Sequence, residues 1–294
     1  MPSRAGFHLS RVVIVESLKP GEVKTGLETA NFVRAQDSTF AAGIPIEYHD
    51  CNGAQDFVNI LATLKLDATR TQNFPLLQVE CHGDDVLGLE FRDTSYLSWP
   101  QLSELLAELN RATRFNLISV FSACYGGYFL SRISTVDPAP CYAMLAPTEA
   151  IWPHEILGAF RTFYSEFFRS MDAGRAMASI SKLSLESGSW MPILAESWYE
   201  HVVINYIQQH CTRHEMKIRT LRTANTLRES GVAVDMHRIK LGLVQGNRES
   251  ITGKFFERYF MVTDIPENAT RFRSLKGRIE KRIEELRATG RYGI

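Results

Sequence analysis

The segment 115–128, FNLISVFSACYGGY, constrains the fold of this chain more than any other stretch. Its first half is almost entirely apolar and too short for a typical helix, which predicts a strand buried on both faces of a parallel sheet. Cys124 follows this strand directly, and two glycines come after Tyr125. Ligands of open α/β sheets bind outside the carboxyl ends of the strands, so the thiol lies where chemistry is expected. The simpler interpretation is a small buried hydrophobic residue, which most free cysteines are.

A second segment ends in a similar way. Residues 74–85, FPLLQVECHGDD, form an apolar run that finishes at Cys-His-Gly, residues 81–83. Between the two segments we predict a crossover helix, because a capping box at 98–101 precedes leucines at helical spacing. A strand, a helix and a strand in this order give a parallel pair. The sequence therefore predicts that His82 and Cys124 lie side by side on neighbouring strand ends.

Length, charge and cysteine content set the broad class of the protein. The chain has 294 residues, enough for one large domain or a domain with an addition, and its 33 basic residues balance 33 acidic ones. This neutral balance removes the simplest argument for a nucleic-acid or membrane partner. No apolar run approaches the roughly 20 residues of a spanning helix, and no signal peptide is recognisable at the first residues. We therefore expect a cytoplasmic protein whose five scattered cysteines are reduced.

The order of predicted elements favours an α/β domain over residues 1–186. Helical segments alternate with short apolar runs, which indicates a mostly parallel sheet with helices on both faces. Strands are predicted at 11–17, at 44–49, within 74–85, within 115–124 and at 141–146. Residues 187–294 contain long polar segments with helical periodicity, so we predict a mostly helical C-terminal region. Its last helix carries a narrow apolar seam that would pack on its own domain or on a partner.

The two motifs together resemble the caspase-like cysteine peptidases, and most of all their bacterial CHAT branch. In that branch a hydrophobic strand runs into Ser-Ala-Cys, as in SACYG at 122–126, and an earlier strand ends in His-Gly. Residues 159–178 are similar to the helix that follows the catalytic strand, and the resemblance covers roughly 11–185. Tyr125 and Gly127 differ from the usual residues after the cysteine, and no tetratricopeptide array is visible. Activation and substrate capture are therefore the least transferable properties.

The resemblance implies a caspase-like sheet and a cysteine endopeptidase that needs no cofactor or metal. His82 would act as general base toward the Cys124 thiol and then as general acid toward the departing amine. The backbone amides of Gly83 and Cys124 would form the oxyanion hole. The implied partners are a protein substrate and an upstream sensor or activator, in bacterial antiviral defence or regulated cell death. The oligomeric state stays open.

Two interpretations of the substrate pocket also stay open. By the resemblance, Ser122 and Lys24 would line the pocket for the residue before the cut, because Lys-Thr-Gly at 24–26 is similar to the Arg-Ser-Gly of caspases. These residues would favour an acidic side chain in the substrate. Glu16 at the end of the first strand, or Asp84 and Asp85 after the histidine, would instead favour Arg or Lys. Solvation alone also accounts for each of these charges.

Other functions fit the same residues. A catalytically silent caspase-like scaffold would bind a partner protein through the helical region, and a cysteine amidase would act on a small molecule. His82 could also be a core histidine with satisfied hydrogen bonds. His210, Cys211 and His214, with His201 earlier in the chain, could suggest zinc, since positions 210 and 214 would share a helical face. No fourth ligand has convincing spacing, and an exposed helix surface explains these residues equally well.

Overall fold

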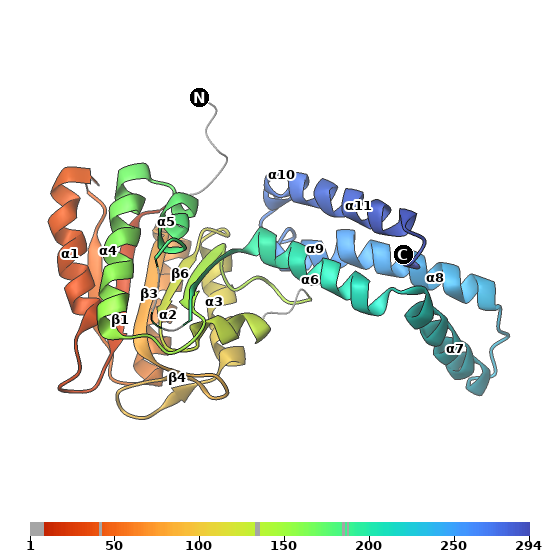
Figure 1. The fold of residues 1–294 in the computed structure, drawn as a ribbon, viewed down its shortest axis with the longest axis horizontal. Helices are drawn as coiled ribbons and strands as arrows, with labels where there is room; N and C mark the ends of the chain where they lie inside the picture. The colour runs from red at the N-terminus through yellow and green to blue at the C-terminus, as the bar shows by residue number, and fades with distance from the viewer. Residues whose placement is uncertain (1–8, 41–42, 133–135, 184–185, 187) are drawn as a thin grey trace. The chain divides into compact units, whose positions relative to one another are not determined.

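The computed structural model describes residues 9–40, 43–132, 136–183, 186 and 188–294. The chain forms two compact units (Figure 1). The first ends at Ala195, and the second runs from Glu196 to Ile294 and includes the short segment 136–138. The division thus falls after Ala195 and not at the predicted residue 186. The reason is an additional strand at 190–194, which pairs with the sheet of the first unit.

A mixed sheet organises the first unit, with the strand order β2-β1-β3-β6-β7-β8. The strands are β1 (Arg11–Ser17), β2 (Ile46–Asp50), β3 (Pro75–Asp84), β4 (Gly88–Glu90), β5 (Tyr96–Leu97), β6 (Ile118–Ser122), β7 (Ala143–Pro147) and β8 (Trp190–Leu194). The five strands from β2 to β7 along this order are parallel, whereas β8 is antiparallel to β7. The strands β4 and β5 extend β3 as a small antiparallel addition. This arrangement confirms the predicted α/β fold with a mostly parallel sheet.

Helices cover both faces of the sheet, as predicted (Figure 1). The helices α1, α4 and α5 lie on one face, and α2 and α3 lie on the other. Their bounds are α1 (Thr25–Phe40), α2 (Ala54–Thr71), α3 (Trp99–Ala112), α4 (Pro153–Ser170) and α5 (Ala173–Ile180). A short 3₁₀ helix, η1 (Gly126–Arg132), follows β6. Val12, Ile14, Leu76, Ile118 and Val120 occupy alternate strand positions and pack in one core with α1, α4 and α5.

Local sequence explains where these helices begin. Ser98 caps α3, and its backbone N–H donates to Gln101 Oε1 at 3.1 Å, which confirms the predicted capping box. Asp172 caps α5 by accepting hydrogen bonds from the backbone N–H groups of Gly174 and Arg175. The apolar residues of α4 recur at helical spacing and are buried on one face of the helix.

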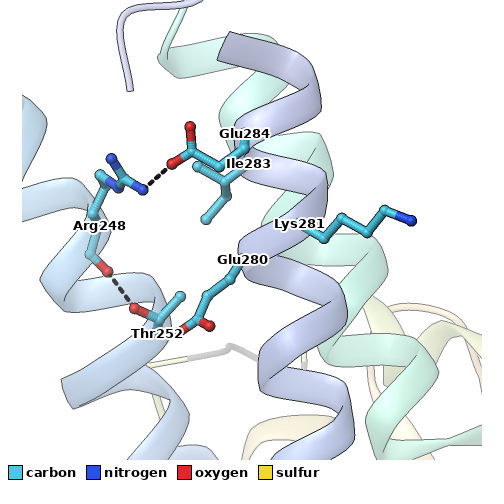
Figure 2. Close-up of a pocket in the computed structure, with 6 residues that line it drawn as sticks. All are labelled: Arg248, Thr252, Glu280, Lys281, Ile283 and Glu284. Carbon is cyan, nitrogen blue, oxygen red and sulfur yellow. Dashed lines mark hydrogen bonds and ion pairs between the residues drawn. The ribbon is translucent and has the colours of Figure 1, made fainter. Parts of the chain in front are cut away.

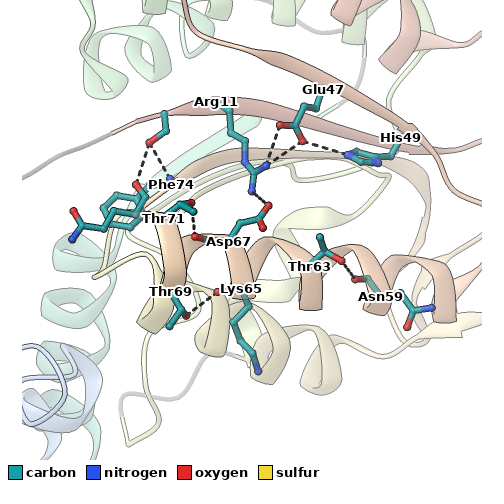
Figure 3. Close-up of polar contacts among 12 residues, drawn as sticks. Arg11, Glu47, His49, Asn59, Thr63, Lys65, Asp67, Thr69, Thr71 and Phe74 are labelled. Atoms are coloured by element: carbon teal, nitrogen blue, oxygen red, sulfur yellow. Dashed lines mark hydrogen bonds and ion pairs between the residues drawn. The ribbon is translucent and has the colours of Figure 1, made fainter.

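A partly buried network of ion pairs connects strands to α2 on one face of the sheet. The guanidinium group of Arg11 contacts Glu47 on β2 at 3.0 Å and Asp67 on α2 at 2.9 Å (Figure 3). Arg11 is 5% exposed, so its charge depends on these two carboxylates for compensation. The pairs therefore hold the first strand, an edge strand and a helix in one arrangement.

The second unit is helical, as predicted. Its helices are α6 (Ala195–His210), α7 (Arg213–Glu229), α8 (Met236–Glu249), α9 (Phe255–Tyr259), α10 (Asn268–Arg271) and α11 (Arg273–Ala288), with a π-helical turn η2 (Ser250–Lys254) after α8. Tyr199, Phe256, Phe260 and Phe272 form an aromatic cluster inside it. The predicted seam of α11 is buried. At the surface, Arg248 on α8 pairs with Glu284 on α11 beside a shallow pocket (Figure 2).

Within the described ranges, no helix combines the length and the apolar character that crossing a membrane requires.

Candidate active site

The carboxyl ends of β3 and β6 meet at the predicted site. These two strands are parallel neighbours, and their ladder ends with Glu80 opposite Ser122. The same register, continued by two residues, puts His82 opposite Cys124. Direct contact between the two backbones supports this placement, because a Cβ atom on Gly83 would lie 2.1 Å from the carbonyl oxygen of Cys124. Only glycine permits such a close approach at residue 83.

His82 lies on a part of β3 that is paired with another strand. Beyond the end of β6, β3 continues to Asp84 and pairs with β4, so that His82 lies opposite Glu90 and Gly83 opposite Leu89. The strands β3 and β4 therefore form a small hairpin that carries His82 and Gly83. The His82 side chain is 41% exposed, so it is not a buried core histidine. A half-exposed imidazole on a paired strand can exchange protons with a ligand at the strand ends.

Cys124 lies on a tight turn after β6. The backbone N–H of Gly126 donates to the carbonyl oxygen of Ala123 at 3.0 Å, and Tyr125 has a positive φ of 58°. The Tyr125 N–H donates to the carbonyl oxygen of Glu149 at 3.3 Å, which anchors the turn to the segment after β7. The turn ends the strand, so the Cys124 side chain is half-buried and not sealed in the core.

Burial separates Cys124 from the other cysteines. All five lie in the described part of the chain, and the remaining four are buried. Burial raises the pKa of the Cys51 thiol to about 11, of Cys141 to about 12 and of Cys211 to about 11. Burial also raises the pKa of Cys81 well above its ordinary value. Because the thiolate is the nucleophile, these four thiols are unsuited to attack, and Cys124 is the candidate that remains.

Glu22 belongs to the site although sequence reasoning did not include it. Its Oε1 atom lies 2.9 Å from Nε2 of His82, and its Oε2 atom accepts a hydrogen bond of 2.6 Å from the backbone N–H of Lys19. Pro20 and Gly21 form the centre of a turn, with Gly21 at a φ of +89°. This turn orients the Glu22 carboxylate toward His82. Partial burial acts to raise the pKa of Glu22, but the bonds to His82 and Lys19 outweigh it and lower the pKa.

Beneath His82 and Cys124 lies a row of buried polar side chains. Glu16, Glu80 and Ser122 occupy matching positions on three neighbouring strands, and all three are buried. Burial raises the pKa of Glu80 to about 7, although the nearby Ser122 hydroxyl and the hydrogen bonds from Thr25 and Gln78 oppose the rise.

Glu16 is fully enclosed in this row. Its carboxylate accepts a hydrogen bond of 2.7 Å from the backbone N–H of Gly26 and another of 2.7 Å from the hydroxyl of Tyr48. Both oxygens of Glu16 therefore already have partners. In this conformation neither Glu16 nor Ser122 presents a charge or a hydroxyl at the surface, in contrast to the predicted roles in a pocket wall.

Two of the other predicted pocket residues have local structural partners, and the third is exposed. The Lys24 ammonium donates to the carbonyl oxygen of Leu18 at 2.6 Å and so braces the loop before α1. Asp84 accepts hydrogen bonds from the N–H groups of Val86 and Leu87, which form the hairpin turn and lower its pKa. Asp85 is exposed. Asp84 therefore has a structural role that explains its charge without a substrate.

The residues that suggested zinc are arranged differently from the prediction. The helix α6 ends at His210 and α7 begins at Arg213, so His210 and His214 do not share a face of one helix. Cys211 is buried and accepts a hydrogen bond from the Asn247 amide, with a nitrogen–sulfur distance of 3.5 Å. Among the residues that the structure describes, no group of three or more His, Cys, Asp or Glu could hold a metal ion.

Neither a comparison with models of known protein families nor a search of curated proteins finds a match for this chain. The assignment of the site therefore rests on its own geometry. A half-exposed imidazole with a carboxylate bonded to it lies at the end of one strand, and a half-buried thiol follows the end of the neighbouring strand. This set of groups can support nucleophilic attack by sulfur with proton transfer to and from a histidine.

Proposed function

We propose that the protein is a caspase-like cysteine endopeptidase that cleaves a partner protein, with Cys124 as nucleophile and His82 as general base. The observation that carries the proposal is the contact of Gly83 with the Cys124 backbone. It holds the His-Gly and Ser-Ala-Cys motifs together at the edge of the sheet where parallel folds bind their ligands. The burial of the other four cysteines supports the same choice of nucleophile.

The reaction would proceed in two stages. His82 takes the proton of the Cys124 thiol, and the thiolate attacks the carbonyl carbon of the scissile amide. The tetrahedral intermediate collapses to a thioester as the amine leaves with the proton from His82. Water, deprotonated by His82, then hydrolyses the thioester and restores the thiol. Backbone N–H groups of Gly83 and Cys124 would stabilise the oxyanion, and losing one such donor costs roughly 3–4 kcal/mol.

The resemblance extends the proposal to the biological setting. It supports a cytoplasmic enzyme of bacterial antiviral defence or regulated cell death that cuts one protein after an upstream sensor or activator has responded. The second unit, which lies outside the resemblance, would serve substrate docking, regulation or assembly. No membrane, nucleic-acid or cofactor partner is part of this proposal.

The proposal is tested with a library of internally quenched peptides and the full chain. Cys124→Ala should abolish all cleavage that the wild-type protein shows, because the nucleophilic sulfur is gone. Cys51→Ala is the matched control, since the same substitution at a buried thiol outside the site should leave cleavage in place. Thermal unfolding of Cys124→Ala should resemble that of the wild type, because the side chain is only half-buried.

Two results would contradict the proposal. One is a wild-type protein that leaves every peptide intact but hydrolyses small amides through Cys124, as a small-molecule amidase would. The other is peptide cleavage that persists in Cys124→Ala at the wild-type rate.

A further inference from the structure

The contact between Glu22 and His82 determines which ring nitrogen of the histidine carries a proton. Nε2 of His82 lies 2.9 Å from a carboxylate oxygen of Glu22. An ionised carboxylate only accepts hydrogen bonds, so Nε2 must be the donor in this contact. In the neutral imidazole the proton then resides on Nε2, and Nδ1 keeps its lone pair. Among the described residues, no hydrogen bond to Nδ1 competes for this lone pair.

The orientation of Glu22 is itself fixed from the other side. Its second oxygen accepts a bond of 2.6 Å from the backbone N–H of Lys19, a group that can only donate. The turn through Pro20 and Gly21 also closes with a bond of 3.2 Å from the Glu22 N–H to the Lys19 carbonyl oxygen. The carboxylate thus bridges a backbone donor and the imidazole, and each oxygen has one assigned partner.

From this geometry we infer that Glu22 is a positioning residue for the proposed peptidase, which holds His82 with its proton on Nε2 so that Nδ1 serves as the base. The inference rests on the proposed function. The proton of the Cys124 thiol passes to Nδ1 and later from Nδ1 to the leaving amine, while the proton on Nε2 stays in place. Glu22 accepts no proton at any stage and acts only through the histidine.

The substitution Glu22→Gln tests this inference sharply because the structure dictates how the new amide must lie. The Lys19 N–H requires an acceptor, so the amide oxygen takes that side and the amide NH₂ group faces Nε2 of His82. Nε2 would then become an acceptor, and the proton would move to Nδ1, the nitrogen proposed as base. An isosteric change thereby reverses the tautomer while it preserves the shape of the loop.

The first measurement reads the tautomer directly and does not depend on cleavage. Nitrogen-15 NMR of the imidazole rings distinguishes protonated from unprotonated ring nitrogens, and the His82 signals are identified by their loss in His82→Gln. We expect the Nε2–H tautomer in the wild type and the Nδ1–H tautomer in Glu22→Gln. Glu90→Gln is the matched control. It removes a carboxylate from the strand opposite His82 that pairs with the Lys19 ammonium and not with the imidazole, so the tautomer should stay unchanged.

The second measurement is the rate of cleavage in the peptide library. In serine proteases, replacing the buried aspartate of the Ser-His-Asp triad by asparagine lowers kcat about 10⁴-fold. We expect a smaller loss of roughly tenfold to a hundredfold for Glu22→Gln, because the pair of Glu22 and His82 is partly solvated. Glu22→Asp keeps an acceptor-only group and should recover part of the rate, whereas a merely structural role would not separate Asp from Gln. A wild-type tautomer in Glu22→Gln, or a wild-type rate in it, overturns the inference.

The two measurements separate this inference from the proposed function. If the wild-type protein cleaves no peptide, the proposed function fails, and the tautomer alone then decides whether Glu22 orients the imidazole. If the protein cleaves peptides and Glu22→Gln retains the Nε2–H tautomer, the proposed function stands and the inference is wrong.

Discussion

Two neighbouring rows of side chains across β3 and β6 have opposite properties. The inner row, Glu80 and Ser122, is buried and lies within the parallel ladder. The outer row, His82 and Cys124, follows two residues later and is partly exposed to solvent. Side chains two residues apart on a strand face the same side of a sheet. The two rows therefore share an orientation and differ only in how deeply they are buried. The position of the strand end therefore decides which polar groups can meet a ligand.

The largest effect expected from this comparison is in thiol reactivity. Cys81 lies one residue before His82 and is buried, so it should react with iodoacetamide only when the structure opens. We expect Cys124 to be alkylated at least about a thousandfold faster than Cys81, since opening of a folded core is that rare. Mass spectrometry of peptides after timed alkylation gives both rates, and in urea the difference should vanish. Equal alkylation rates of Cys81 and Cys124 in the folded protein would contradict the difference in accessibility described here.

The next effect concerns the contact between the two strand ends. A methyl group at Gly83→Ala would overlap the carbonyl oxygen of Cys124, so the segments that carry His82 and Cys124 must move apart. A displacement of about 1 Å can cost on the order of a hundredfold in rate, and we expect a loss of this size in kcat/KM for peptide cleavage. Gly158→Ala on α4 is the control, because the space around it is open. That variant should cleave normally and unfold at a slightly higher temperature, since alanine is the better helix former.

The inner row predicts a pH dependence of stability. The pKa of Glu80 is raised from 4.5 to about 7 by burial, so the folded state holds this proton more tightly than the unfolded chain does. The contribution of Glu80 to the free energy of unfolding is therefore complete below about pH 4.5 and declines by about 3 kcal/mol as the pH rises through 7. Glu80→Gln should be more stable than the wild type at pH 8 by up to this amount and nearly equal to it at pH 4.

Urea unfolding of both proteins at the two pH values measures this difference. Glu104→Gln, an exposed carboxylate on α3, is the control and should show no such dependence. A stability difference for Glu80→Gln that is the same at pH 4 and pH 8 would show that folding does not raise the pKa of Glu80.

The smallest effect is expected at Asp84. Asparagine can accept the same two backbone hydrogen bonds that shape the hairpin turn. Asp84→Asn should therefore change neither the equilibrium constant of unfolding nor KM by more than about twofold. The measurement is KM for matched peptides with Arg, Lys, Asp or Glu before the cut. A tenfold rise in KM for the basic peptides alone would instead assign Asp84 to the substrate pocket.

Much of the fold could be predicted because its signals are local. The apolar runs of β1, β3 and β6 and the capping box of α3 each lie within a few neighbouring residues. The parallel pairing of β3 and β6 then followed from the single helix between them. The strand β8 escaped prediction because WMPIL is short, contains a proline and follows a polar segment, and its pairing with β7 is antiparallel.

In the candidate site too, residues with a local sequence signal could be predicted and residues held by long-range contacts could not. His82 and Cys124 mark the ends of recognisable strands, so their proximity could be anticipated from topology. Glu22 could not, because its contact with His82 joins a loop to a strand 60 residues further along the chain, and only the Pro-Gly turn before Glu22 hinted at a fixed conformation. The burial of Glu16 was also unforeseeable, because the donors to its carboxylate, the Gly26 N–H and the Tyr48 hydroxyl, come from different elements.

The hairpin formed by β3 and β4 gives the two halves of the site unequal freedom. The histidine belongs to a strand with a ladder partner, whereas the sulfur belongs to a four-residue turn anchored through the Tyr125 amide. In the proposed acyl transfer the sulfur would have to approach a carbon atom, bond to it and release it, and rotation within 123–126 would supply that travel without breaking the sheet. The imidazole would then remain a stationary reference point for the proton while the sulfur moves.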